Sequence, residues 1–136
     1  MILMQFCIDV KTPTVGSFFQ GGIVLSYNDT TKKGLIISSK DLDSNLTWIE
    51  GKTVCDTSTL MGYDNWRMPT TEEMLLCYKV LHLNRKGNFN IITPYWGSRE
   101  GKLGYFAWFV DFSNANAYPS TENNVAQIRA IRDFRL

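Results

Sequence analysis

Two apolar runs near the start of the chain flank a polar segment. Residues 21–27 (GGIVLSY) are apolar and β-branched, residues 28–34 (NDTTKKG) are rich in turn formers, and residues 35–38 (LIIS) are apolar again. This pattern predicts a β-hairpin. Because its apolar runs are continuous, we expect side chains to cover both faces of its strands.

Apolar residues take a helical period after the hairpin. From Ser44 to about Thr57, Trp48, Val54 and Cys55 fall near one stripe and charged residues lie on the other side. A first helix is therefore expected over this stretch. One of the polar residues before it is expected to act as the N-cap.

A second helix has a clearer start. Thr70 can accept hydrogen bonds from the first helical amides, and Glu73, three residues on, can reach back to the backbone of Thr70. Glu72 and Glu73 are thereby interpreted as first-turn carboxylates that suit the helix dipole. The helix is expected to end within residues 84–88, which include Gly87. Its predicted buried stripe consists of Met74, Leu75, Tyr78 and Leu81.

The last third of the chain predicts a β-meander, because short apolar and aromatic runs alternate there with Gly, Ser, Asn and Pro. The middle run carries apolar groups on both faces, so we expect an interior strand with Trp108 and Phe112 in the core. Residues 113–124 are polar and predict a loop or a short edge ribbon. The expected strands are Tyr95–Arg99, Tyr105–Phe112 and Val125–Phe134.

This order of elements predicts an α+β fold in which two helices pack against one antiparallel sheet. A chain of 136 residues has room for one domain, residues 1–136, in which residues 1–20 form an N-terminal arm.

Composition narrows the function classes. Fourteen Lys and Arg against thirteen Asp and Glu give a net charge of +1, so no long-range field attracts nucleic acid. Because His82 is the only histidine, His-rich metal sites are excluded. His82 itself is interpreted as a capping or surface residue. No apolar stretch is long enough for membrane insertion. The first ten residues lack a basic region and reach Asp9 too early for a secretory signal.

The three cysteines, Cys7, Cys55 and Cys77, are interpreted as buried reduced thiols, because their number is odd and no C-x-x-C pair occurs. A bridge between Cys55 and Cys77 stays open if their helices pack together in an oxidising compartment.

Residues 41–45 (DLDSN) have the spacing that opens a calcium loop, but the rest of such a loop is missing. Leu46 stands where a glycine is required and Lys52 where a bidentate glutamate is required. We therefore expect no metal site. The sequence also contains no Gly-rich phosphate loop, no G-x-S-x-G motif and no H-E-x-x-H motif, so we expect no cofactor and no catalytic residue.

Tyr118 lies in an Asn-dense stretch, in which a rigid ring is combined with amides that can donate and accept hydrogen bonds. This combination is typical of recognition surfaces, although a solvated turn without a ligand is an equally open interpretation.

Residues 62–70 (GYDNWRMPT) resemble the "GGYSDWRLPT" signature of the Legionella collagen-like adhesin C-terminal domain family. Other pieces are similar in the same order over residues 21–134. They are residues 21–24 and 33–35 for the opening hairpin, Thr47, Trp48 and Cys55 for the first helix, residues 72–74 for the second, residues 95–98 for the "YWSS" strand and residues 128–132 for the terminal "VRCVR".

The resemblance implies a C-type lectin-like fold, related to the formylglycine-generating sulfatase-modifying fold and to retroelement variable proteins. It also implies structural roles in which Trp66 fills the core, Arg67 pairs to hold its loop and Pro69 sets the start of the second helix. Three departures are notable: Met68 replaces Leu, residues 97–99 (GSR) replace a small polar run, and Ala130 stands where Cys is frequent.

The expected function is a non-enzymatic adhesion module that recognises a glycan or surface protein, at a cell surface or on a virion. Alternatives are a phage or retroelement-linked variable receptor-binding protein and a structural virion or assembly subunit that forms a homo-oligomer. A sulfatase-modifying type of enzyme is disfavoured because no cysteine follows Cys77. The expected ligand-binding residues are Ser98, Arg99, Tyr105, Asn114, Asn116, Tyr118, Asn123 and Asn124.

Overall fold

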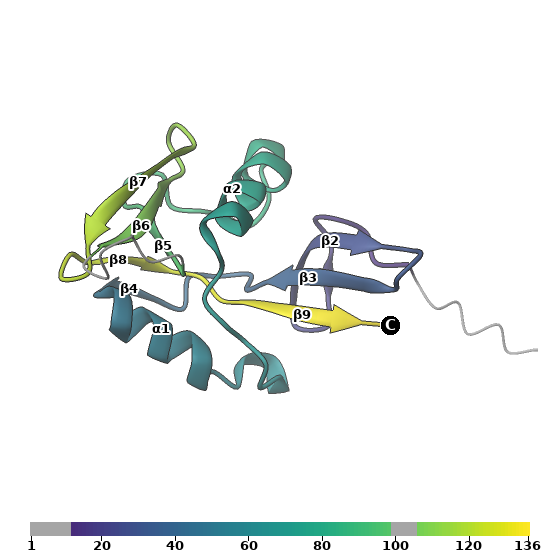
Figure 1. The fold of residues 1–136 in the computed structure, drawn as a ribbon. Helices are drawn as coiled ribbons and strands as arrows, with labels where there is room; N and C mark the ends of the chain where they lie inside the picture. Colours follow the sequence, from purple (N-terminus) through teal and green to yellow (C-terminus); the bar gives the residue numbers. More distant parts are fainter. Residues whose placement is uncertain (1–11, 99–105) are drawn as a thin grey trace, which may run out of the picture.

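The computed structural model describes residues 12–98 and 106–136, which form two sheets and two α-helices (Figure 1). The first sheet is antiparallel and consists, in spatial order, of β1 (Phe18–Phe19), β2 (Gly22–Asn28), β3 (Lys33–Ile37) and β9 (Ile131–Arg135). The second consists of β4 (Asp43–Leu46), β8 (Ala126–Ile128), β5 (Tyr95–Gly97), β6 (Phe106–Asp111) and β7 (Asn116–Thr121). The helices are α1 (Trp48–Thr57) and α2 (Thr71–Val80), and short 3-10 turns cover Leu60–Gly62 and His82–Asn84.

The α+β class is confirmed, but the expectation of one antiparallel sheet is wrong. The strands form two sheets, and β5 pairs with β8 in parallel. The predicted strand Val125–Phe134 is divided into β8 and β9, and this segment runs from one sheet to the other (Figure 1). The division falls at Arg129 and Ala130, where polar contacts replace strand pairing.

The predicted hairpin is confirmed as β2 and β3. Ile36 and Ile37 are both fully buried and belong to different core clusters. Since neighbouring strand residues point to opposite faces, both faces of this sheet are covered, as expected. Part of the expected N-terminal arm, residues 1–20, contacts the first sheet: Phe18 and Phe19 pair with β2 as β1, and the backbone of Gly16 and Ser17 bonds to Val24.

The capping box of α2 is confirmed. The Glu73 backbone N–H donates to Thr70 Oγ1 over 3.1 Å, and the Thr70 N–H donates to Glu73 Oε1 over 2.8 Å. The helix ends earlier than predicted, at Val80. Met74 and Cys77 of the helix and its C-cap Leu81 are fully enclosed, whereas Leu75 and Tyr78 are partly buried.

The first helix is shorter than predicted. It begins at Trp48 because residues 43–46 pair with β8 as strand β4, and its N-cap is Thr47 and not one of residues 41–45. Its buried residues are Trp48, Gly51 and Cys55, and Val54 is only partly buried. A side chain at position 51 would collide with Ile128, so this glycine lets α1 lie close against β8.

Two aromatic residues of the predicted middle strand were expected in the core. Phe112, which directly follows β6, is 1% exposed and lies in the core. Trp108 of β6 is only partly buried and lies outside both core clusters. The expectation for Trp108 is therefore wrong. Its cross-strand neighbours are Gly97 and Pro119, which offer little side chain to cover an indole.

Cys55 and Cys77 are buried and free, which confirms the expected reduced thiols and excludes a bridge between them in this structure. Burial raises the pKa of the Cys55 thiol to about 12 and raises that of Cys77 as well. Cys7 lies outside the described residues.

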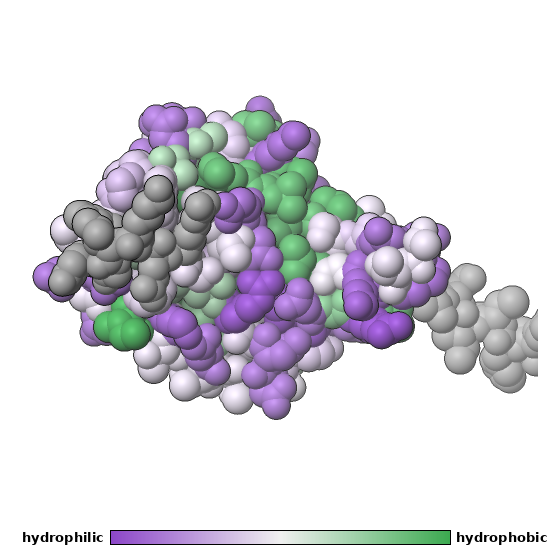
Figure 2. Space-filling model, in the orientation of Figure 1, coloured by the Kyte–Doolittle hydropathy of each residue, from purple (hydrophilic) through white to green (hydrophobic). Residues whose placement is uncertain are grey.

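Apolar residues that are partly buried, such as Leu76 and Val80 of α2, pack against the second core cluster, and apolar surface gathers beside α2 (Figure 2). Among the described residues, no helix has the length and apolar character needed to cross a membrane.

Candidate binding surface

The polar segment between β6 and β8 forms a ribbon whose strand, β7, is an edge strand of the second sheet. The alternative of a short edge ribbon is thus confirmed for residues 116–121. Pro119 suits this position, because proline lacks the N–H that an interior strand needs and blocks a further strand from pairing there.

Tyr118 and Asn116 share one face of β7, since side chains of a strand alternate in direction. The Tyr118 side chain is in contact with Phe109 of β6, the two rings meeting edge to face with centroids 5.7 Å apart. Phe109 in turn packs on Trp96, with centroids 4.2 Å apart. Although 40% exposed, Tyr118 is therefore held by a stack of rings that continues into the core.

The phenol of Tyr118 is kept protonated. Burial raises its pKa, and the nearby carboxylate of Asp111 raises it further. At neutral pH this side chain is thus a hydrogen-bond donor and acceptor with an exposed ring.

The turn that precedes β7 is ordered by its own polar side chains. Asp111 Oδ1 accepts hydrogen bonds from the backbone and the hydroxyl of Ser113, over 2.8 and 2.7 Å. Asn114 Oδ1 accepts from the Asn116 N–H over 3.0 Å. This turn forms a hydrophilic surface in the upper left of Figure 2. Asn114 and Asn116 therefore both lie at the start of β7.

The remaining predicted residues lie at the other end of the strand. Asn123 and Asn124 follow β7, and the Asn124 side-chain amide donates to the Ser120 hydroxyl over 2.6 Å. Ser98 follows Gly97, whose partner Trp108 pairs with Pro119, so it also belongs to this end of the sheet. At about 3.3 Å per residue, Asn116 and Ser120 are roughly 13 Å apart. Because the Asn124 amide contacts Ser120, the two groups of amides are separated by about that distance.

The structure therefore does not gather the predicted residues into one pocket. The ribbon carries five of them, Asn114, Asn116, Tyr118, Asn123 and Asn124, with Tyr118 between two polar ends, and Ser98 lies apart, after β5. Two of the predicted residues, Arg99 and Tyr105, lie outside the described residues.

Two of the residues for which structural roles are expected lie in matching environments, Trp66 in the core and Arg67 in an ion pair. Trp66 is 3% exposed, and its indole N–H donates to the Leu60 carbonyl over 2.9 Å. Arg67 binds both carboxylate oxygens of Glu73, over 2.7 and 2.8 Å, and its Nε donates to Asp133 over 3.3 Å. These contacts tie the segment to α2 and β9.

Pro69 is buried directly before the N-cap of α2. Its carbonyl accepts a hydrogen bond from the Ser98 N–H over 2.7 Å, which joins the start of α2 to the end of β5. Ser98 thus has a backbone contact to the segment of residues 66–69, and it lines a cavity together with Arg67 and Thr70.

Replacing Glu73 with glutamine is expected to lower stability by about 1–2 kcal/mol at neutral pH, because a bidentate ion pair and half of a capping box are weakened. Burial raises the pKa of Glu73, but hydrogen bonds from Arg67 and Thr70 outweigh it and the pKa lies below its ordinary value. The stabilisation is thus complete above about pH 4.5 and is lost as the pH falls through the lowered pKa.

Urea unfolding of both proteins at several pH values measures this. The difference between wild type and Glu73→Gln should shrink as the pH falls below about 4.5, and a difference that stays constant down to pH 2 would contradict the assignment. Asp56→Asn is the control, since Asp56 forms an exposed pair with Lys52 on α1 and should change stability by less than about 0.5 kcal/mol.

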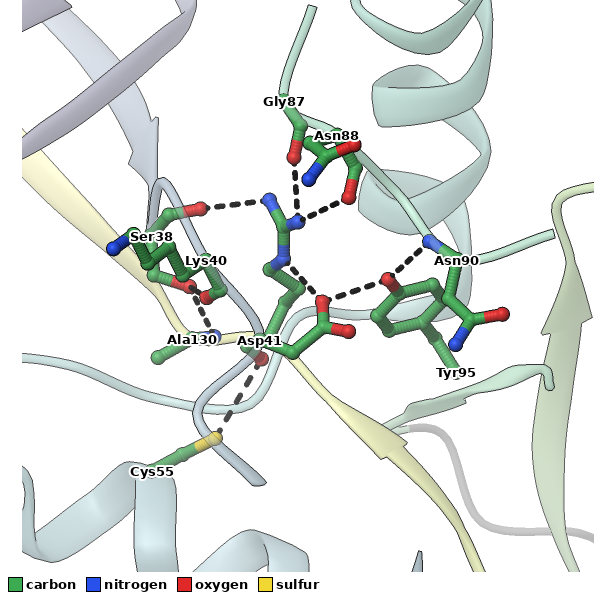
Figure 3. A network of polar contacts seen from close by, with 10 residues as sticks. Ser38, Lys40, Asp41, Cys55, Gly87, Asn88, Asn90, Tyr95 and Ala130 are labelled. Carbon is green, nitrogen blue, oxygen red and sulfur yellow. Dashed lines mark hydrogen bonds and ion pairs between the residues drawn. The ribbon is translucent and has the colours of Figure 1, made fainter. Parts of the chain in front are cut away.

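A buried arginine, which the sequence did not single out, lies in the chain between β8 and β9 and is the centre of a polar network, whose other residues are labelled in Figure 3. The Arg129 side chain is 1% exposed, and its Nε donates to Asp41 Oδ1 over 2.7 Å. One terminal nitrogen donates to the Ser38 carbonyl over 3.0 Å. The other donates to the carbonyls of Gly87 and Asn88, over 2.5 and 3.2 Å.

The same network orients Tyr95 of β5. Its hydroxyl donates to Asp41 Oδ1 over 2.7 Å and accepts from the Asn90 N–H over 2.8 Å. Burial raises the pKa of Tyr95, so the phenol stays protonated. Asp41, which was considered as part of a calcium loop, is thus used by Arg129 and Tyr95, and the described residues contain no group of three or more potential metal-ligating His, Cys, Asp or Glu residues.

His82 begins the 3-10 turn after α2, one residue beyond the C-cap Leu81, and is partly buried beside aromatic rings. Its ring lies 5.3 Å from that of Tyr78 and 5.5 Å from that of Phe112, measured between centroids. Its backbone carbonyl accepts from the Arg85 N–H over 2.9 Å. The imidazole is therefore positioned by ring packing, and the expected capping role falls to the backbone.

An apolar cleft that was not predicted lies between β1 and the 3-10 turn Leu60–Gly62. It encloses about 510 Å³, and its wall includes Phe18 and Met61, which are 61% and 59% exposed. Met61 is held in the left-handed region with a φ of 57°. The sequence does not indicate that a methionine adopts this conformation, because glycine is the residue usually found there. The exposed position of Met61, and with it the cleft, could therefore not be predicted from the sequence.

Comparison of the chain with protein-family models and with curated proteins gives no match in either case.

Proposed function

We propose that this protein is a non-enzymatic recognition module that binds its ligand along β7, at a surface made of Asn114, Asn116, Tyr118, Asn123 and Asn124. The ligand that suits this surface best is a glycan. Amide side chains match the alternating donors and acceptors of sugar hydroxyls, and a fixed aromatic ring offers an apolar face between them.

One observation carries the proposal: Tyr118 is exposed, yet it is held edge-on against Phe109 and lies two residues from Asn116 on the same strand face. An aromatic ring that is already fixed loses little conformational freedom when it binds. The separation of roughly 13 Å between the two amide groups favours an extended oligosaccharide over a single sugar.

We also propose that the two sheets and two helices represent a C-type lectin-like fold. The support is the sequence resemblance of residues 62–70, together with the structural use that the chain makes of Trp66 and Arg67. In this interpretation, residues 66–69 stabilise the domain and the ribbon around β7 carries the specificity.

A glycan array tests the function. The wild-type protein is expected to bind a defined subset of oligosaccharides, and the Asn116→Ala/Tyr118→Ala double variant is expected to lose at least about tenfold in affinity, because a ring contact and an amide contact disappear together. Ile49→Ala/Thr53→Ala, on the exposed face of α1, is the control and should bind as wild type does.

Unchanged binding by the folded double variant would remove β7 as the site. If the array shows no bound glycan but the protein binds intact cells, and the same double variant abolishes that binding, the partner of this surface is a protein instead.

A further inference from the structure

A cavity of about 440 Å³ lies on a different part of the molecule, where the turn after α2 meets β2. We call it the 82–89 cavity. Its charged lining residues are Arg85 and Lys86, and the residues of its lining include no Asp or Glu. In a chain whose net charge is only +1, this is a local concentration of positive charge.

Arg129 fixes the direction of the backbone peptide groups at the wall of this cavity. The carbonyls of Gly87 and Asn88 both point inward to one guanidinium nitrogen (Figure 3). In a planar trans peptide, the carbonyl and the following N–H point in opposite directions. The N–H groups of Asn88 and Phe89 therefore point away from Arg129.

These two N–H groups have no acceptor within the part of the chain that the structure describes. Their direction is fixed, because Gly87 and Asn88 adopt left-handed φ values of 84° and 49° and because Arg129 also lies over the Phe89 ring, 4.2 Å from its centroid. A side chain at position 87 would collide with the Phe89 ring, so glycine is needed there.

Adjacent outward N–H groups and nearby cations are the groups that bind oxyanions in proteins. His82 also lines the cavity and carries at least one ring N–H. Lys86 is exposed, and the carbons of its stem lie close to Gly16, so its ammonium group stays accessible to a bound anion.

We propose that the 82–89 cavity binds a phosphoryl group, with the N–H groups of Asn88 and Phe89 on its oxygens and Arg85 and Lys86 neutralising its charge. The cavity has more room than a phosphate ion fills, so a phosphate monoester fits as well as the free ion. This site is separate from β7 and does not depend on the function proposed for it.

A ¹H–¹⁵N NMR titration of the full chain with sodium phosphate, at constant pH and constant ionic strength, tests this site. We expect saturable shifts of the Asn88 and Phe89 amide signals, with no change at Tyr118. Arg85→Gln/Lys86→Met removes both charges and keeps the Lys86 stem, so it should weaken binding by about tenfold or more.

The matched control is Lys33→Met/Arg135→Gln, which removes the same charges from exposed cross-strand partners in the first sheet and should leave the affinity unchanged. Shifts that rise linearly without saturation, or equal weakening in both double variants, would overturn the proposal.

Titration with glucose 6-phosphate identifies the source of the phosphoryl group. Tighter binding of the ester assigns the site to phosphorylated metabolites or sugars, and tighter binding of inorganic phosphate assigns it to the free ion. A failure of both compounds to shift the Asn88 and Phe89 signals would contradict the site, whatever the glycan array shows for β7.

Discussion

Trp66→Ala is expected to destabilise the protein by about 3–5 kcal/mol, because it removes a large ring from a packed core and leaves a cavity. Trp66 is 3% exposed and belongs to the same core cluster as Trp48, Met68 and Ile128. Its ring also lies 5.7 Å from the guanidinium of Arg132. The truncation therefore weakens contacts between residues 60–68, α1 and the first sheet.

Thermal unfolding measures this effect, and a fall in Tm of more than about 10 °C is expected for a chain of this size. The control is Trp66→Phe, which keeps most of the ring and loses the indole N–H to the Leu60 carbonyl; it should cost much less, about 1–2 kcal/mol. A Trp66→Ala variant that melts within a few degrees of wild type would show that this ring does not hold the core together.

The second large effect is expected from Arg129→Met, which keeps much of the side-chain volume and removes the charge. Asp41 would keep a partly buried carboxylate without its partner, and the inward carbonyls of Ser38, Gly87 and Asn88 would lose their donors. Breaking a buried ion pair on one side costs about 3–5 kcal/mol. The change should therefore rival that of Trp66→Ala.

Urea unfolding gives the loss in free energy. Arg135→Gln is the control, because Arg135 is exposed at the end of β9 and its loss should change stability by less than about 0.5 kcal/mol. Equal stability of Arg129→Met and Arg135→Gln would mean that the network of Figure 3 contributes nothing to the fold.

Local signals predicted the parts of the fold whose determinants are close in sequence. The capping box of α2 depends on Thr70 and Glu73, three residues apart, and the first hairpin depends on one turn. In both cases the residues that decide the structure are only a few positions apart in the chain, so the local sequence pattern was sufficient to predict the element.

Elements set by distant partners could not be predicted in this way. Residues 43–46 (DSNL) have little strand propensity, and they form β4 because Asp43 and Leu46 pair with β8 from the far end of the chain. The break between β8 and β9 likewise depends on Arg129 meeting Asp41. The available signal was Arg129 itself, which stands between the apolar residues Ile128 and Ala130, since a buried charge needs a partner.

The candidate site was predicted in its composition and not in its arrangement. Tyr118 and the asparagines were recognised from residue type, but which of them share a face follows from the pairing of Tyr118 with Phe109. The 82–89 cavity could not be predicted from residue types, because its N–H groups belong to the backbone. Their direction is set by Arg129, whose side chain binds the carbonyls of Gly87 and Asn88 from some 40 residues further along the chain.

The most direct test of the central claim, that β7 is the ligand-binding surface, is NMR mapping with the oligosaccharide that binds best on the array. The largest amide shifts are predicted at residues 114–118, with smaller ones at 123 and 124. Shifts confined to other parts of the molecule, such as the cleft beside Phe18 and Met61, would contradict the account.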